Sequence, residues 1–207
     1  RTWCSDGAPT TPSTWRPDPP LRRPGHVGSV PGMETEIVPD TKDWTWVLQR
    51  PCPECGYHAA AVQPSGVPEL IRSNAQQWAV VLAAGEAARR RPAAGVWSPL
   101  EYGCHVRDVL RLFDQRLTLM LTRDDPLFDN WDQDATAVQE RYGEQDPVTV
   151  SAELRSAADT IADHFAGVQG AQWSRPGRRS DGSAFTVDSF ARYFLHDIVH
   201  HAHDVRR

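Results

Sequence analysis

The pattern of hydrophobic and polar positions predicts four long amphipathic helices. In four stretches, apolar residues recur at three- and four-residue intervals, which is the spacing of one face of an α-helix. The stretches span about residues 67–91, 98–123, 146–167 and 186–205. A shorter helix is predicted around 134–141, and Asp181-Gly182 predicts a turn that permits a small hairpin. Four amphipathic helices joined by polar loops predict an all-α fold, a four-helix bundle.

Signals at the helix ends support these boundaries. Ser98 is a favourable N-cap, Pro99 takes the first helical position, and Glu101 completes a capping box. Pro68 suits the first turn of the preceding helix in the same way. The basic run 89–91, followed by proline, suits a helix C-terminus by charge and by the stop.

The chain before the helices divides into two parts. Residues 1–40 are crowded with Pro, Gly, Ser, Thr and Arg and hold almost no aliphatic side chains, so we expect a disordered Pro-rich leader. Met33 is the first methionine, so the residues before it could come from a gene model that starts too far upstream. The alternative is a genuine flexible tail. We expect residues 41–66 to form an extended arm with a Cys-x-x-Cys loop, and residues 67–207 to form the bundle.

Composition then limits the function classes. A formal net charge of -5 and a pI of about 5.9 argue against a nucleic-acid binder. No run approaches the roughly 18 apolar residues of a transmembrane helix, so no membrane partner is expected. The start lacks the apolar region of a secretory signal peptide. Four cysteines are too few for a disulfide scaffold, which favours a reduced, cytoplasmic location.

Cys52 and Cys55 form a Cys-x-x-Cys pair followed by Gly56, as at the start of a zinc knuckle. A structural zinc site needs two more ligands, usually a second pair. No second Cys-x-x-Cys is present, and Cys104 and His58 lack the spacing of a knuckle. A redox pair would need a βαβ context, which the pattern does not predict. The favoured interpretation is two reduced thiols in a loop packed on the bundle, with a second metal site or a redox pair as alternatives.

Four of the eight histidines lie within eight positions near the C-terminus. His196 and His200 are four residues apart, so a helix presents both imidazoles on one face, where they can bind one metal ion. The alternative is a solvated, histidine-rich helix end. Bundle packing can bring His105 of the second helix beside them, although a lone histidine on a helix face is more often a hydrogen-bonded core residue. Three imidazoles would leave positions open for water or substrate, as in catalytic sites.

At these residues the chain resembles the DinB superfamily, which includes the mycothiol-dependent maleylpyruvate isomerase and the bacillithiol-type S-transferases. The resemblance covers about residues 68–204. It is carried by Trp97, Glu101, His105 and Asp108 at spacings of four, four and three, by His196 and His200, and by the polar residue His203. The resemblance implies an up-down-down-up four-helix bundle that binds Zn²⁺ or Ni²⁺ through His105, His196 and His200.

Several polar residues are expected around this metal. Asp108, Glu101 and His203 are predicted to support the ligands or to lie at the rim, and His201 is expected to face away. Many members have a small residue and then Gly-Gln where this chain has His201-Ala202-His203.

Three arginines precede the last helix. Arg175, Arg178 and Arg179 are candidates for clamping an anionic ligand bidentately. The alternative is a solvated basic loop that balances an acidic body.

Together these features predict a metal-dependent small-molecule enzyme, and the resemblance implies a reaction in which a mycothiol-like thiol attacks an electrophile. The alternatives are a metal-dependent hydrolase using the same site and a non-catalytic metal-binding or stress-related bundle. The expected partners are a small-molecule substrate and a low-molecular-weight thiol, and a homodimer is compatible with such a bundle.

Overall fold

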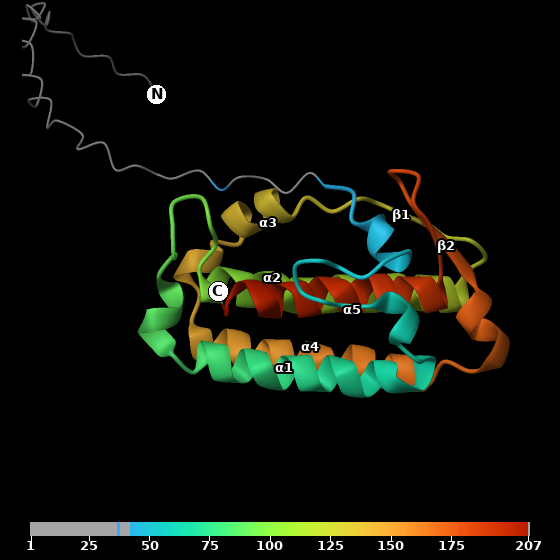
Figure 1. Ribbon diagram of the computed structural model, residues 1–207, viewed down its shortest axis with the longest axis horizontal. Helices are drawn as coiled ribbons and strands as arrows, with labels where there is room; N and C mark the ends of the chain where they lie inside the picture. The colour runs from blue at the N-terminus through green and yellow to red at the C-terminus, as the bar shows by residue number, and fades with distance from the viewer. Residues whose placement is uncertain (1–36, 38–41, 207) are drawn as a thin grey trace, which may run out of the picture. The chain divides into compact units, whose positions relative to one another are not determined.

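The computed structural model describes residue 37 and residues 42–206, all of which belong to one compact unit. The leader predicted over residues 1–40 lies outside the described residues, except for residue 37. Four long helices dominate the described chain (Figure 1). They are α1 (Val67–Leu82), α2 (Pro99–Thr122), α4 (Pro147–Ala166) and α5 (Val187–Asp204), with a short α3 (Gln133–Gln139) between α2 and α4.

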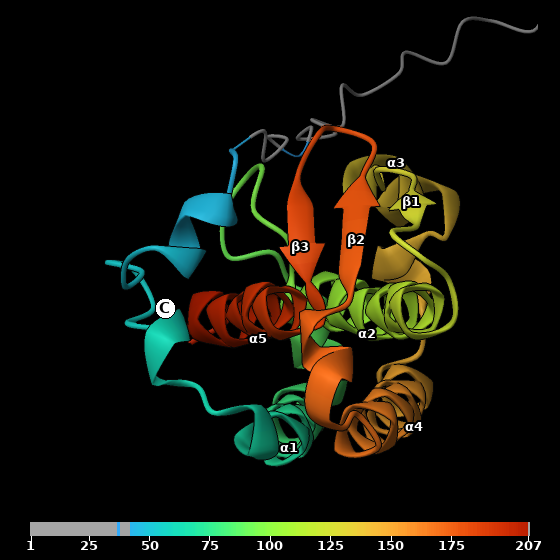
Figure 2. The same ribbon diagram turned by 90° about the vertical axis from the view of Figure 1, so that its right-hand side faces the viewer.

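The four long helices form a four-helix bundle, as the sequence predicts. Viewed along the helices, α5 and α2 lie side by side above α1 and α4 (Figure 2). The chain runs in one direction along α1 and α5 and in the opposite direction along α2 and α4 (Figure 1). The topology is therefore up-down-down-up, and α2 and α4 are joined by a long crossover over residues 123–146.

The apolar stripes of the four helices meet in one core. Ile71 and Trp78 of α1, Leu110 of α2, Leu154 of α4 and Phe194 of α5 are each at most 1% exposed. Burial of side chains of this size contributes about 1.5–3 kcal/mol each. The capping box predicted at the start of α2 is present: the Glu101 amide donates to the Ser98 hydroxyl, and the Ser98 amide donates to the Glu101 carboxylate.

The first helix is shorter than the hydrophobic pattern predicts. It ends at Leu82, and a separate 3-10 helix, η4 (Gly85–Arg89), follows. Gly85 has a φ of 58°, in the left-handed region that interrupts a right-handed helix. The alanine-rich sequence on both sides of Gly85 continues the helical pattern, which explains why the pattern alone extended the helix to residue 91.

The crossover and the last loop meet in a small sheet of three strands in the order β1-β2-β3. The strands are β1 (Leu127–Phe128), β2 (Pro176–Arg179) and β3 (Ala184–Thr186). β1 pairs with β2 in parallel, and β2 pairs with β3 as the hairpin that Asp181-Gly182 predicted. Gly182 supplies the positive φ, 95°, that this turn needs.

The arm before α1 contains three short 3-10 turns joined by irregular segments, whereas an extended arm was expected. They are η1 (Thr45–Leu48), η2 (Ala59–Ala61) and η3 (Pro64–Gly66). Val47 is fully buried, and the Tyr57 hydroxyl donates to the backbone carbonyl of Arg192 on α5 at 2.7 Å. The arm therefore packs on the last helix.

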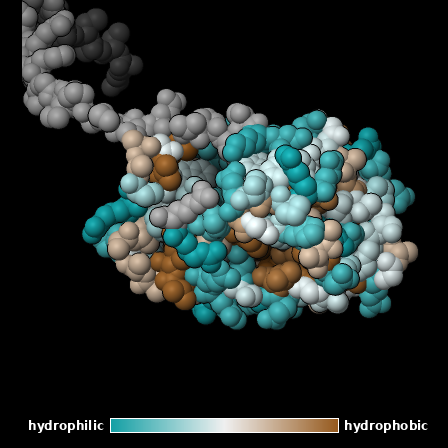
Figure 3. Space-filling model, in the orientation of Figure 1, coloured by the Kyte–Doolittle hydropathy of each residue, from teal (hydrophilic) through white to brown (hydrophobic). Residues whose placement is uncertain are grey.

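The described surface is mixed in character. Figure 3 shows one face on which hydrophobic areas are separated by hydrophilic ones. Within the described chain, no helix combines the length and apolar character needed to cross a membrane.

Candidate metal centres

Helix α5 presents potential metal ligands on two neighbouring faces. Successive residues of a helix are rotated by about 100°, so positions four apart share a face and adjacent positions do not. His196 and His200 lie on one face, and Asp197 and His201 lie on the next. Each pair meets ligands from a different part of the chain. The result is two groups of possible ligands, which we call the His–Asp centre and the Cys–His centre.

The His–Asp centre consists of His105 from α2 and of Asp197 and His201 from α5. Asp197 Oδ1 lies 3.6 Å from His105 Nε2 and 3.5 Å from His201 Nε2. The two imidazole rings meet edge to face, with their centroids 4.7 Å apart. A tetrahedral zinc ion with bonds of about 2.0–2.2 Å to N and O spaces its ligand atoms roughly 3.3–3.6 Å apart. The two distances are therefore those expected of ligands around one such ion.

Buried polar atoms without hydrogen-bond partners make this centre a candidate binding site. His105 is fully buried, and neither of its ring nitrogens has a hydrogen-bond partner among the described residues; the same holds for Asp197 Oδ1. A buried polar atom left unpaired costs about 1–3 kcal/mol. A divalent cation would satisfy His105 Nε2 and Asp197 Oδ1 together, so these atoms fit a metal ion.

Electrostatics favours a neutral His105 and a charged Asp197, the protonation states in which these side chains can bind a metal ion. Burial lowers the pKa of His105, although Asp197 opposes the shift, so the imidazole is neutral at pH 7. Burial alone would raise the pKa of Asp197, but its contacts with His105 and His201 outweigh that effect and lower it. His201 Nδ1 lies 3.4 Å from Asp204 Oδ2, and a carboxylate in this position orients a ligating imidazole.

Aromatic rings enclose His105. Trp131 of the crossover stacks on the imidazole, with ring centroids 5.4 Å apart and an angle of 8° between the ring planes. Trp97, which precedes α2 in the chain, has its ring centroid 5.2 Å from that of His105. The crossover thus provides one wall of the His–Asp centre. These rings limit the access of water to the imidazole from two sides.

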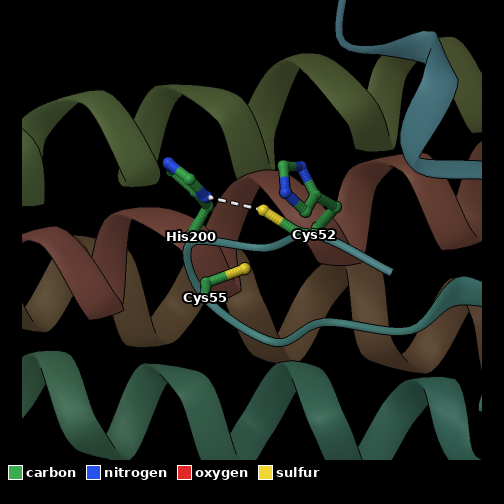
Figure 4. Close-up of side chains that lie close together, drawn as sticks. Cys52, Cys55 and His200 are labelled. Carbon is green, nitrogen blue, oxygen red and sulfur yellow. Dashed lines mark hydrogen bonds between the residues drawn. The ribbon is translucent and has the colours of Figure 1, made fainter. Parts of the chain in front are cut away.

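The Cys–His centre joins the arm to the other face of α5. It consists of Cys52, Cys55, His196 and His200, and one ligand atom from each lies within 4.8 Å of the others. Cys52 Sγ is 3.7 Å from His200 Nδ1 (Figure 4). Trp44 of the arm covers both imidazoles, with ring centroids 5.3 Å from His196 and 4.9 Å from His200.

Burial dominates the protonation of this second group. It lowers the pKa of His196 to about 4, helped by His200, and it also lowers the pKa of His200. Burial raises the pKa of the Cys55 thiol to about 11. A reactive redox cysteine needs a lowered pKa, so the environment of Cys55 does not favour a redox role.

Comparison with known proteins assigns the chain to a family. A profile described as the DinB superfamily matches residues 69–205. The chain belongs to the DinB superfamily. A comparison with curated proteins found no match. Among solved structures, YfiT from Bacillus subtilis aligns with a TM-score of 0.62 and 17% identity over 68% of this chain and 83% of YfiT. YfiT is described as a probable metal-dependent hydrolase with an unusual four-helix bundle topology.

Within this DinB fold, the structure divides the predicted three-histidine set. His105 lies with Asp197 and His201, whereas His196 and His200 lie with the cysteine pair. The expectation that His201 faces away was wrong, because its ring packs against that of His105.

His203, predicted at the rim, belongs to neither group. Its partly exposed ring lies beside His200, with centroids 6.5 Å apart.

Two residues predicted to support the metal, Glu101 and Asp108, have hydrogen-bond and ion-pair partners within the protein. Glu101 caps α2 and forms an ion pair with Arg91. Asp108 accepts a hydrogen bond from the Tyr142 hydroxyl at 2.6 Å and pairs with Arg107. Both carboxylates therefore tie α2 to the segments around it.

The three arginines predicted to clamp an anion each have partners within the protein. Arg175 donates to the backbone carbonyls of Met120 and Arg123 at the end of α2, both at 2.6 Å. Arg178 pairs with Asp125, and Arg179 pairs with Asp181. Their contacts give the anion clamp no support.

Sequence reasoning missed Asp197 and His201 as candidate ligands, and it did not join the cysteine pair to α5. A signal for the second omission was present. Structural zinc sites also combine Cys-x-x-Cys with a histidine pair spaced by three to five residues, and His196-x-x-x-His200 has that spacing.

Proposed function

We propose that this DinB protein is a metal-dependent enzyme that acts on a small molecule and holds its metal ion at the His–Asp centre. The observation that carries the proposal is the fully buried His105, neither of whose ring nitrogens has a hydrogen-bond partner among the described residues. Its Nε2 lies 3.6 Å from Asp197 Oδ1, and its ring centroid lies 4.7 Å from that of His201. Three protein ligands are typical of catalytic sites, which keep a coordination position for water or substrate. A divalent ion bound there would supply Lewis acidity, lowering the pKa of a coordinated water or thiol.

The chain's own residues have distinct parts in this proposal. His105, Asp197 and His201 bind the ion, and the charge of Asp197 partly neutralises it. Asp204 holds the His201 ring in its orientation from the Nδ1 side, at 3.4 Å. Trp131 and Trp97 exclude bulk water around His105, which strengthens electrostatic interactions in the centre.

We propose hydrolysis as the reaction class, with water as the nucleophile. A ligand set of two histidines and one carboxylate is known from zinc hydrolases, and the structural neighbour YfiT is described as a probable metal-dependent hydrolase. Transfer to a mycothiol-like thiol, the reaction implied by the sequence resemblance, is the second candidate. It is less favoured because Arg175, Arg178 and Arg179, which were to hold a carboxylate, are paired within the protein.

Metal-reconstituted protein tests the proposal. The chain, stripped of metal and reloaded with Zn²⁺ or Ni²⁺, is assayed with a panel of esters and amides, and separately with electrophiles and low-molecular-weight thiols. Asp197→Asn is compared with Asp188→Asn, a partly exposed aspartate of α5 that pairs with Arg192 on the same helix. We expect metal-dependent turnover that falls at least about tenfold in Asp197→Asn and is unchanged in Asp188→Asn.

The outcomes separate the three candidate functions. Turnover without added thiol supports hydrolysis, and strict thiol dependence supports S-transfer. Stoichiometric metal at the His–Asp centre without turnover on any substrate would favour the non-catalytic bundle. Full activity in Asp197→Asn would refute the proposed ligand set.

A further inference from the structure

We propose that Cys52, Cys55, His196 and His200 form a structural Cys₂His₂ zinc site that fastens the arm, residues 42–66, to helix α5. This site is separate from the His–Asp centre and has no part in the proposed reaction. The two centres use neighbouring faces of α5, so this one helix would carry both a catalytic and a structural ion.

The arm has little regular structure of its own. It contains three 3-10 turns and no α-helix. Its attachment to α5 includes the Tyr57 hydroxyl bond to the Arg192 carbonyl and the packing of Trp44 on His196 and His200. Short segments of this kind lose much conformational entropy when they become ordered, and a metal cross-link offsets that cost.

The loop between the two cysteines is shaped so that both sulfurs face α5. The Cys52 amide donates to the Tyr57 carbonyl at 2.8 Å, and the Gly56 amide donates to the Cys52 carbonyl at 2.9 Å. Gly56 has a φ of 74°, a conformation that side chains disfavour, so glycine is needed at this turn. Figure 4 shows Cys52 and Cys55 on this loop beside His200, with the sulfur of Cys52 directed toward the His200 ring.

The distances fit a tetrahedral ion. With Zn–S of about 2.3 Å and Zn–N of about 2.0–2.1 Å, ligand S and N atoms lie roughly 3.5–3.6 Å apart. Cys52 Sγ and His200 Nδ1 are 3.7 Å apart, although 148 positions separate them in the sequence. All four ligand atoms lie within 4.8 Å of one another. Small movements of side chains would close this group around one ion.

The imidazoles supply an independent observation. His196 is 3% exposed, and its Nε2 is buried without a hydrogen-bond partner among the described residues. His200 directs Nδ1 to the cysteine, while its Nε2 lies 3.8 Å from Glu54 Oε2 and 3.8 Å from Asp204 Oδ1. Carboxylates behind the non-ligating nitrogen are the usual partners of a metal-bound histidine.

The number of ligands decides the role. Four protein ligands complete a tetrahedral shell and leave no position for substrate, which is typical of a structural zinc site. On binding, both cysteines ligate as thiolates, and their protons pass to solvent. The His–Asp centre, with three ligands, lacks sulfur, so the two centres differ in their spectroscopic signature as well as in their role.

Cobalt substitution tests this site directly. The reduced full-length chain is stripped of metal and titrated with Co²⁺, which shows thiolate-to-cobalt charge transfer only where cysteines ligate. We expect this band in the wild type, its loss in Cys52→Ser and its retention in His105→Ala. Cys104→Ser is the matched control, because Cys104 is a buried cysteine that contacts the Tyr142 carbonyl and the Gln145 side chain instead.

Hydrogen exchange on the wild type guards against variants that fail to fold. With Zn²⁺ bound, we expect the amides of Cys52 and Gly56 to exchange at least tenfold more slowly than after chelation, while the amides of α1 and α4 change little. The proposal is overturned if the wild type shows no thiolate band, or if a disulfide joins Cys52 and Cys55 in the purified chain. It is also overturned if Cys52→Ser keeps the band, or if His105→Ala abolishes it.

Discussion

Replacement of Glu101 by glutamine separates a structural role from a role at the metal. Glu101 lies one helical turn before His105, and the sequence places it among the residues that would support the ligands. In the structure its carboxylate accepts from the Ser98 amide at 2.7 Å and from Arg91 Nε at 3.0 and 3.2 Å. Glutamine at this position can still complete the capping box, so Glu101→Gln removes mainly the charge that faces Arg91.

The expected loss of stability is modest. A hydrogen bond to a charged group contributes about 1.5–3 kcal/mol. The Glu101 side chain is 9% exposed, but that of Arg91 is 36% exposed, and solvent screening reduces the gain. We therefore expect a loss of about 1 kcal/mol, which lowers Tm by about 2–4 °C for a domain of this size.

The loss should depend on pH. Burial alone would raise the pKa of the Glu101 carboxyl, but Arg91 and Ser98 outweigh it and hold the pKa below its ordinary value of 4.5. A carboxyl whose pKa is lowered by folding stabilises the protein above the unfolded pKa, and that contribution disappears as pH falls through the folded value. The Tm difference between wild type and Glu101→Gln should therefore be largest at pH 7 and should shrink toward zero as the pH falls below 4.5.

Thermal unfolding of wild type and Glu101→Gln over this pH range, with metal content measured in parallel, checks the reasoning. Glu144→Gln is the control, because Glu144 pairs with Arg141 while both side chains are exposed, and we expect almost no change in its Tm. A Glu101→Gln variant that loses metal but keeps its Tm would refute the structural role and support the role predicted from the sequence.

Two further substitutions test other structural assignments. Tyr142→Phe removes the 2.6 Å hydrogen bond to Asp108 from a residue that is 1% exposed, so urea denaturation should show a loss of about 1.5–3 kcal/mol with unchanged metal content; an unchanged unfolding midpoint would contradict this. Arg175→Ala removes the donors that satisfy the Met120 and Arg123 carbonyls, so it should lower Tm without changing KM for anionic substrates. A raised KM with unchanged Tm would instead support the anion clamp.

The sequence predicted the architecture because its signals are local. The apolar periodicity and the Ser98, Pro99 and Glu101 signature identified α2 almost to the residue. The position of Gly182 likewise predicted the hairpin. The end of α1 could not be read in the same way, because a single left-handed residue, Gly85, interrupts an otherwise helical composition.

Which side chains of α5 belong to the His–Asp centre and which to the Cys–His centre could not be predicted from local signals. His196 and Asp197 are adjacent, and a rotation of α5 by about 100° decides which of them faces His105. That rotation is set by the packing of the whole bundle and of the arm. The arm also decides where the cysteine pair lies, since Cys52 reaches His200 only through tertiary contacts.

The central claim is that the histidines of α5 serve two different metal centres. Cobalt titration of His196→Ala and His201→Ala tests it most directly. We expect His196→Ala to lose the thiolate-to-cobalt band and to keep the ion of the His–Asp centre, whereas His201→Ala should keep the band and lose that ion. Release of the ion held by His105 in His196→Ala, with none released in His201→Ala, would contradict the two separate centres, because His105, His196 and His200 would then share one metal.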